Sequence, residues 1–161
     1  MFRPATADDL VALCGLERAA NLEALGHVFP PDRFPFPEDD VLARWALVME
    51  DPSARILVAD GQDGDGLLAC AAYDDSTLRH LAVRPDHWGR GLATQAIEVA
   101  LHDMDRRGET VASLWCLREN HRARRLYEHL GWRGTSDERE APWPPHPVEM
   151  RYTRLIVQSE R

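Results

Sequence analysis

The segment that most constrains the fold is a junction in the middle of the chain, where an apolar stretch runs through glycines into a long helical pattern. The stretch covers residues 77–83, the turn holds Gly89 and Gly91, and the helical pattern covers residues 91–107. Such a junction leaves free N–H groups and the positive end of a helix dipole at one point. Glycine has no Cβ, so the backbone there can approach a ligand closely. The junction predicts an anion site, although an isolated pair of glycines would equally suit an ordinary tight turn.

Apolar periodicity on both sides of the junction predicts the other elements. Thr6, followed by two acids, is typical of a helix N-terminus, and the apolar stripe behind it predicts a helix that ends near Ala20. A second helix is expected to end near Met49. Strands are expected over residues 55–59, 67–73, 77–83, 111–117 and 148–157, and a further helix over residues 120–130. Short connections favour antiparallel neighbours, so we expect one domain over residues 1–161 with an α/β sheet of mixed direction.

Composition and charge exclude several classes of function. All 19 basic residues are arginine, which excludes a Schiff-base lysine and a P-loop lysine. The formal charge of −8 argues against a nucleic-acid binder and mildly favours a cationic or neutral partner. The sequence has no apolar run of about 18 residues and no signal-peptide layout, so we expect a cytoplasmic protein without a membrane segment. Cys14, Cys70 and Cys116 stand apart among apolar neighbours, which predicts small buried side chains and no metal site.

A second patterned block begins at Asn120 and ends at Trp132. Asn120, Ala123, Tyr127 and Leu130 recur at helical spacing and therefore share one face of the expected helix. The rest of this helical face is apolar and faces a core, so the amide and the phenol on it each need a hydrogen-bonding partner. The block adds a second signal to the glycine junction.

With both motifs in view, the sequence resembles the GNAT family, the acetyl-CoA-dependent N-acetyltransferases. The pyrophosphate loop of the family reads Q/R-x-x-G-x-G/A, and residues 88–93 match it except that Trp88 replaces Gln or Arg. The later family block, N-x-x-A-x-x-L-Y-x-x-x-G-F, is matched at Asn120, Ala123, Leu126, Tyr127 and Gly131, with Trp132 in place of Phe. The resemblance covers nearly the whole chain. It implies a mixed, largely antiparallel central sheet of six to seven strands flanked by about four helices.

The resemblance also implies roles for particular residues. Backbone groups near Val83 would pair with the pantetheine arm of acetyl-CoA, amides of residues 89–94 would hold the pyrophosphate, and Asn120 would bond the pantetheine. The implied coenzyme-binding residues are Leu81, Ala82, Val83, Trp88, Gly89, Arg90, Gly91, Leu92, Ala93, Thr94 and Asn120. Tyr127 would stand near the thioester sulfur as a general acid, although a core phenol is the other interpretation. Arg90, Arg124 or Arg125 would reach the nucleotide phosphates, unless they only form a solvated face.

The acceptor side is less defined by the sequence. By family analogy, a small-molecule or peptide amine would lie near His27, Phe34 and Trp143, whose rings line a pocket or plug the domain. In histone acetyltransferase relatives a glutamate serves as the base, and Thr77 stands at its position here. The candidates that remain for the base are Asp75, His80, His27, His146 and water. Relatives are often homodimers, so a homodimer is also expected.

Three other functions can be weighed against N-acetyl transfer. A dinucleotide-dependent oxidoreductase needs a third glycine where Thr94 stands, and an acid after the next strand, which is missing. A serine hydrolase needs a G-x-S-x-G motif, which does not occur. A non-catalytic acyl-CoA-binding module on the same fold stays open, because Thr77 is not a carboxylate.

Overall fold

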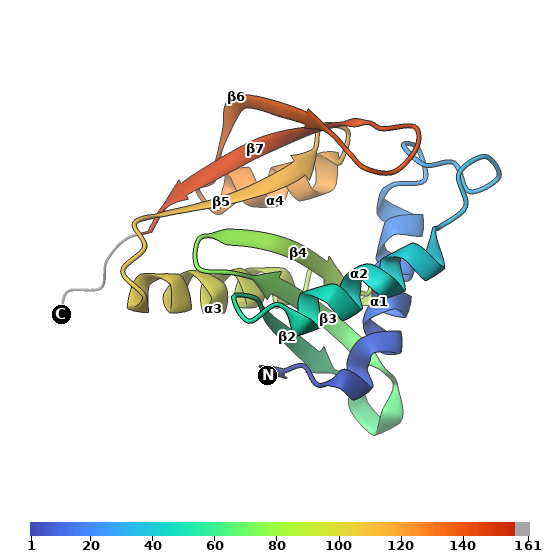
Figure 1. The fold of residues 1–161 in the computed structure, drawn as a ribbon, viewed down its shortest axis with the longest axis horizontal. Coiled ribbons are helices and arrows are strands. Elements are labelled where there is room, and N and C mark those ends of the chain that lie inside the picture. Colours follow the sequence, from blue (N-terminus) through green and yellow to red (C-terminus); the bar gives the residue numbers. More distant parts are fainter. Residues whose placement is uncertain (157–161) are drawn as a thin grey trace.

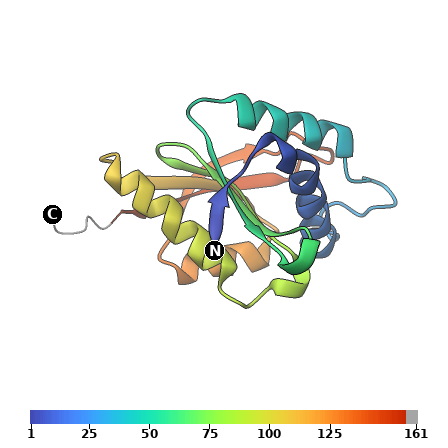
Figure 2. The ribbon, with the colours of Figure 1, turned by 90° about the horizontal axis from the view of Figure 1, so that it is seen from below.

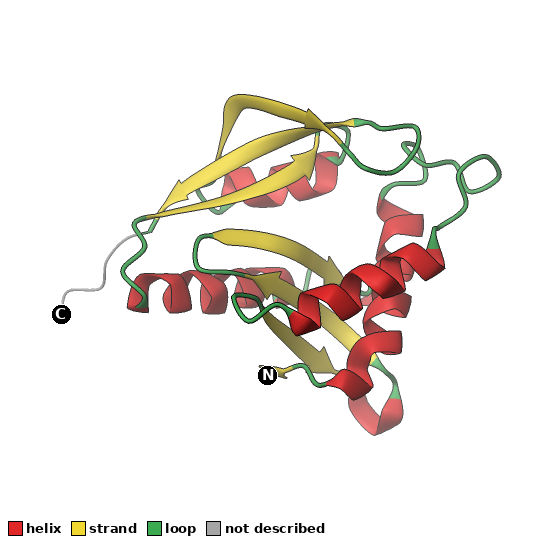
Figure 3. Ribbon diagram, viewed as in Figure 1, coloured by secondary structure: helices red, strands yellow, loops and turns green. Residues whose placement is uncertain are grey.

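The structure is a computed structural model that describes residues 1–156, and within them seven strands form one sheet (Figures 1 and 3). The strands are β1 (Phe2–Pro4), β2 (Arg55–Asp60), β3 (Leu67–Tyr73), β4 (Thr77–Val83), β5 (Val111–Leu117), β6 (Arg133–Glu140) and β7 (Val148–Leu155). They lie in the order β1-β2-β3-β4-β5-β7-β6, and only β4 and β5 pair in parallel. The helices are α1 (Leu10–Ala24), α2 (Glu38–Glu50), α3 (Leu92–Arg106) and α4 (His121–His129). The predicted mixed, largely antiparallel α/β fold is confirmed.

Both faces of the sheet are covered by helices (Figure 2). Cys70 and Ala72 of β3 pack in a core with α1 and α2, whereas Ala71 and Tyr73 pack in a core with α3 and α4. Alternate residues of a strand point to opposite faces, so a strand buried on both sides must be apolar throughout. The uninterrupted apolar run of β3 follows from that position.

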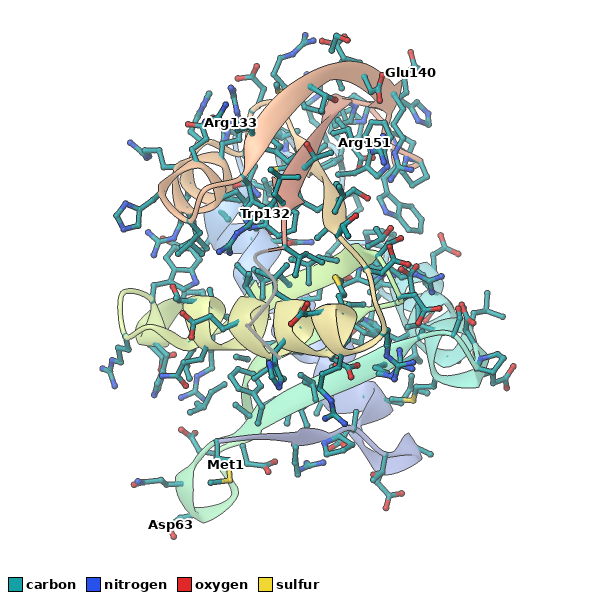
Figure 4. The ribbon with its side chains drawn as sticks, turned by 90° about the vertical axis from the view of Figure 1, so that its left-hand side faces the viewer. Met1, Asp63, Trp132, Arg133, Glu140 and Arg151 are labelled. Atoms are coloured by element: carbon teal, nitrogen blue, oxygen red, sulfur yellow. The ribbon has the colours of Figure 1, made fainter. Side chains whose placement is uncertain are left out.

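The structure differs from the prediction by periodicity at one helix end and in two additional strands. Helix α1 continues to Ala24 instead of ending near Ala20, because Leu25 beyond it is also buried. β1 is too short to show alternation, and β6 is a mostly exposed edge strand whose charged side chains, including Arg133 and Glu140, carry no apolar signal (Figure 4). The expected end of the last strand at Val157 lies outside the described residues.

The three cysteines are buried and unbonded, as their apolar neighbours predict. Among residues 1–156, no helix combines the length and the apolar character that crossing a membrane requires. Within the same residues, no group of three His, Cys, Asp or Glu side chains is placed to hold a metal ion.

The feature that positions the site is the separation of β4 from β5. Both strands have seven residues, yet they pair only at Thr77 with Ser113 and at Leu78 with Leu114. β4 also has one more residue than β3 between their paired positions, because Tyr73 faces Leu78 whereas Ala72 faces His80. Such a bulge bends a strand and breaks its ladder. Beyond Leu78, the edge of β4 that faces β5 is therefore without a strand partner (Figure 1).

Candidate active site

A cleft of about 710 Å³ opens beside the free end of β4. Its walls are the end of β4, the glycine loop, the first turn of α3, one face of α4 and the C-terminal half of α1. Of the residues implied to act, those lining the cleft are Leu81, Ala82, Val83, Trp88, Gly89, Gly91, Leu92, Ala93, Thr94, Asn120 and Tyr127. Arg90 is exposed and lies outside the lining. The structure thus brings two sequence motifs to one cavity.

The glycine loop has a conformation that other residues rarely adopt. Gly89 has φ 77° and Gly91 has φ 83°, both in the left-handed region. A Cβ at Gly91 would meet nothing closer than 3.9 Å, so the requirement for glycine comes from the backbone angle and not from crowding. Gly91 precedes α3, whose first N–H groups have no partner within the helix. These N–H groups lie at the rim of the cleft, and a helix N-terminus of this kind can bind an anion.

Trp88 fastens this loop to the sheet. Its indole Nε1 donates to the carbonyl oxygen of Val83 at 2.8 Å, and the Arg122 guanidinium lies 3.9 Å from the ring centroid. The Trp88 side chain is partly buried and packs against Ala59, Ala69 and Val83. The residue that replaces Gln or Arg in the motif therefore has a structural role and also forms a wall of the cleft.

The arginines of α4 divide into two groups. Arg122 and Arg125 line the cleft and can balance the charge of an anionic ligand. Arg124 instead donates to the hydroxyl of Tyr152 at 3.0 Å and to the carbonyl of Arg118 at 3.0 Å. It anchors α4 to the sheet and lies outside the lining of the cleft.

Asn120 and Tyr127 line the cleft from the two ends of α4. The Oδ1 of Asn120 accepts from the backbone N–H of Ala123 at 3.2 Å and caps the helix, which leaves the Nδ2 group as its donor toward a ligand. The ring of Tyr127 packs against Trp132 and Tyr152, with centroids 6.0 and 6.2 Å apart. Burial, and then the nearby Cys116, raise the pKa of Tyr127, so its hydroxyl keeps its proton at neutral pH.

Two further cavities adjoin the cleft. An opening of about 170 Å³ lies between the separated strands, lined by β4, β5, Asn120 and Tyr127. A groove of about 490 Å³ lies between α1, the loop of residues 29–37, α2 and the β6–β7 connection. Asn21 of α1 lines the cleft, the opening and the groove. The three cavities therefore meet at the C-terminal half of α1.

Two of the three expected acceptor residues lie together. Phe34 and Trp143 line the groove. His27 does not; its Nε2 lies 2.7 Å from the carbonyl oxygen of Glu119, and its ring stacks on His121 with centroids 6.2 Å apart. His27 thus joins the α1–α2 connection to the start of α4.

The sequence-derived candidates for the base are mostly placed elsewhere. Asp75 lies at the other end of β4, 3.6 Å from Arg55 and 3.5 Å from Arg107, and the Nδ1 of His146 lies 3.0 Å from the Ala141 carbonyl oxygen. His80 does line the opening, but burial, followed by nearby arginines, lowers its pKa to about 3. It is therefore neutral at physiological pH and a weak base.

Periodicity alone did not single out Glu17 and Asn21, which line both the opening and the groove. They follow Leu13 at steps of four, so they continue the inward stripe of α1. A carboxylate and an amide on a stripe that faces inward indicate a site, as Asn120 and Tyr127 do on α4.

Comparisons with known proteins agree with this geometry. Residues 19–132 match the family model described as Acetyltransferase (GNAT) family. A mycothiol acetyltransferase from Beutenbergia cavernae is 34% identical over 117 residues, which are 69% of this chain and 39% of that protein. The chain thus spans about two fifths of the length of that curated relative.

Two solved structures share the fold. A GCN5-related N-acetyltransferase from Rhodopseudomonas palustris superposes with a TM-score of 0.78 at 14% identity, covering 96% of this chain and 94% of that one. The PaiA N-acetyltransferase of Thermoplasma acidophilum, solved in complex with coenzyme A, superposes with a TM-score of 0.73 at 13% identity, covering 96% and 98%. The family match spans most of the chain and includes both site motifs, so this protein belongs to the GNAT family of acetyltransferases.

Proposed function

We propose that this protein transfers an acetyl group from acetyl-CoA to a primary amine of a small molecule or peptide, by direct attack of the amine on the thioester. The observation that carries the proposal is the junction of three cavities at Asn21: a cleft with the start of α3 in its wall, an opening between β4 and β5, and a groove lined by α1 and α2. A donor in the cleft and an acceptor in the groove would meet in the opening.

The cleft suits the extended, anionic shape of acetyl-CoA. Beyond Leu78, β4 has no partner strand on the side of β5, so backbone groups of Leu81 and Val83 would bond the pantetheine amides as an added strand would. The N–H groups at the start of α3 suit the pyrophosphate, and Arg122 and Arg125 add positive charge. The coenzyme A complex of the Thermoplasma acidophilum relative supports this assignment.

The chemistry needs donors at two atoms. As the neutral amine attacks, the carbonyl oxygen gains negative charge, which a backbone N–H near Val83 would stabilise by about 3 to 4 kcal/mol. As the C–S bond breaks, the leaving sulfur needs a proton, which the Tyr127 hydroxyl would donate. The raised pKa of Tyr127 keeps that proton available. A homodimer and a cytoplasmic location stay predictions from the sequence.

Calorimetric titration with acetyl-CoA, with NADH as a control ligand, tests the coenzyme assignment. Thiol release with a panel of amino acids, polyamines, aminoglycosides and peptide N-termini then tests transfer. Acetyl-CoA binding with NADH inert and with turnover of one amine class is the expected result. Absence of acetyl-CoA binding up to millimolar concentration would overturn the proposal.

A non-catalytic acyl-CoA-binding module is the second candidate. It is favoured by Thr77, whose hydroxyl lies 3.4 Å from that of Ser113 at the closed end of the β4–β5 pair and offers no carboxylate. Acetyl-CoA binding without turnover of any amine in the panel would select this candidate.

A further inference from the structure

A buried carboxylate stands between the opening and the groove. Glu17 of α1 is 9% exposed, and its Oε1 accepts from the Nη2 of Arg44 on α2 at 2.5 Å. Its other oxygen, Oε2, is buried and has no hydrogen-bond partner among residues 1–156. A buried carboxylate oxygen without a donor is costly, and a ligand that supplies a donor removes that cost.

Glu17 differs from the other acids of these two cavities. Asp40 lines the groove only and is exposed. Glu149 lines the opening only, and its Oε2 accepts from the Nε of Arg139 at 2.6 Å. Glu17 lines both cavities, so its side chain stands where an acceptor bound in the groove would enter the opening.

The walls of the groove restrict the rest of the acceptor. They are mainly aromatic and proline rings, namely Phe29, Phe34, Pro35, Phe36, Pro37, Trp143 and Pro144. The charged residues of the lining are Glu17, Asp40, Arg33 and Arg44, two of each sign, so the groove has no excess of negative charge to hold a polycation. Such a site suits one ammonium group on an apolar body.

Resting on the proposed function, we propose that Glu17 binds the ammonium group of the acceptor through Oε2 and takes its proton, and that the acceptor is a monoamine with an apolar body. Transfer of one proton to the Glu17 carboxylate leaves a neutral amine, whose lone pair forms the C–N bond as the C–S bond breaks. The nitrogen then loses a second proton, and the sulfur leaves as a thiol with a proton from Tyr127. The second proton that the nitrogen loses goes to the Tyr127 oxygen. Glu17 releases to solvent the proton that it took from the ammonium group.

The surroundings of Glu17 suit this role. Burial raises the pKa of Glu17, while the charge of Arg44 opposes the shift, so the carboxylate is a stronger base than an exposed one. His80, which lines the same opening from β4, stays neutral because burial lowers its pKa to about 3. Glu17 is thus better suited than His80 to accept a proton from an ammonium group.

Calorimetry with 2-phenylethylamine, without any acyl donor, tests the ammonium site. Glu17→Gln should weaken amine binding on the order of 10- to 100-fold, because Gln keeps the size and the contact with Arg44 but loses the charge. The matched control is Glu23→Gln, an exposed acid of the same helix outside these cavities, which should bind the amine as wild type does. On wild-type protein, 2-phenylethanol, the neutral analogue, should bind more weakly than the amine by a similar factor. This comparison of two ligands uses wild-type protein only, so it does not depend on the folding of a variant.

Turnover tests the proton transfer. With acetyl-CoA as donor, Glu17→Gln should reduce kcat for 2-phenylethylamine by about 100-fold, while its affinity for acetyl-CoA stays unchanged. Glu23→Gln, the exposed acid of the same helix, is the matched control and should keep kcat within about threefold of wild type. Glu149→Gln, at the other acid of the opening, is assayed as the competing base.

Four results would overturn the inference: unchanged amine affinity in Glu17→Gln, equal affinity for the alcohol and the amine, tighter binding of spermidine than of 2-phenylethylamine, or loss of turnover in Glu149→Gln but not in Glu17→Gln. The amine titration needs no coenzyme, so it separates this inference from the proposed function. Amine binding through Glu17 with no acetyl-CoA binding would support the ammonium site and overturn the acetyl transfer. Acetyl-CoA binding with no amine binding would support the coenzyme assignment and overturn the ammonium site.

Discussion

The cleft and the groove are built in different ways. The cleft is formed largely by two short stretches, residues 81–94 and 120–127, and much of what it offers a ligand is backbone: the free edge of β4 and the N–H groups at the start of α3. The groove is formed by side chains from α1, residues 29–37, α2 and the β6–β7 connection. A backbone site depends on glycines at fixed positions, whereas a side-chain site can be built in many ways. Changes in the two regions should therefore affect coenzyme and acceptor separately.

The largest effect is expected from Gly91→Asp. The substitution places a carboxylate where the pyrophosphate would bind and a side chain at φ 83°, so affinity for acetyl-CoA should fall on the order of 100-fold or more. Calorimetry measures the loss. Gly108→Asp is the matched control, because Gly108 has φ 88° just beyond the other end of α3 and lies outside the cleft. If both variants lost acetyl-CoA affinity equally, general damage to α3 would explain the result and the anion site would be wrong.

Tyr127→Phe should have the second-largest effect. It should change the rate of acetyl transfer and leave coenzyme binding unchanged. Loss of the acid should reduce kcat by about 100-fold and leave the dissociation constant of acetyl-CoA unchanged. Tyr73→Phe serves as control, since the Tyr73 hydroxyl donates to Asp103 in another part of the fold. Full kcat in Tyr127→Phe would make Tyr127 a core phenol only.

The pH profile gives an independent check on Tyr127. An acid is active while protonated, so activity that depends on Tyr127 is retained at low pH and is lost as pH rises through its pKa. Burial raises that pKa above the ordinary value of about 10. Between neutral pH and about 10 we therefore expect no loss of kcat due to Tyr127, and a loss above that range that Tyr127→Phe abolishes.

The contrast between the two regions also explains what the sequence could predict. The glycine loop depends on local backbone angles, and Asn120 and Tyr127 share a helical face because of their spacing. The sequence alone therefore predicts both features. β6 was not, because an exposed edge strand has no apolar alternation. Glu17 was missed because its partner Arg44 lies on another helix, and whether a carboxylate is buried depends on packing that no local pattern contains.

Phe34→Ala should affect the groove alone. Removing the ring takes away apolar contact with an acceptor, so the KM for 2-phenylethylamine should rise by about 10-fold, while acetyl-CoA affinity stays at the wild-type value. Leu47→Ala is the control, because Leu47 of α2 is 67% exposed and lies outside the groove. A loss of acetyl-CoA affinity in Phe34→Ala would show that the two regions are not separable.

Substitution of Asn120 should have the smallest effect on acetyl-CoA affinity. It also separates coenzyme binding from helix stability, because one amide has both roles. Its Oδ1 caps α4, and its Nδ2 is free to bond the pantetheine. Asn120→Asp keeps a cap oxygen and loses the donor, so acetyl-CoA affinity should fall by about 2- to 10-fold with Tm unchanged. Asn120→Ala loses both atoms and should also lower the free energy of unfolding by about 1 kcal/mol.

Calorimetry and thermal melts of the two variants separate these roles. If Asn120→Asp bound acetyl-CoA as wild type does while Asn120→Ala bound it weakly, Asn120 would act only by holding α4, and with it Tyr127, in place. If both variants lost affinity equally but only Asn120→Ala lost stability, the Nδ2 donor would contact the coenzyme directly. The second outcome is expected, because Asn120 lines both the cleft and the opening and its capping oxygen is already occupied.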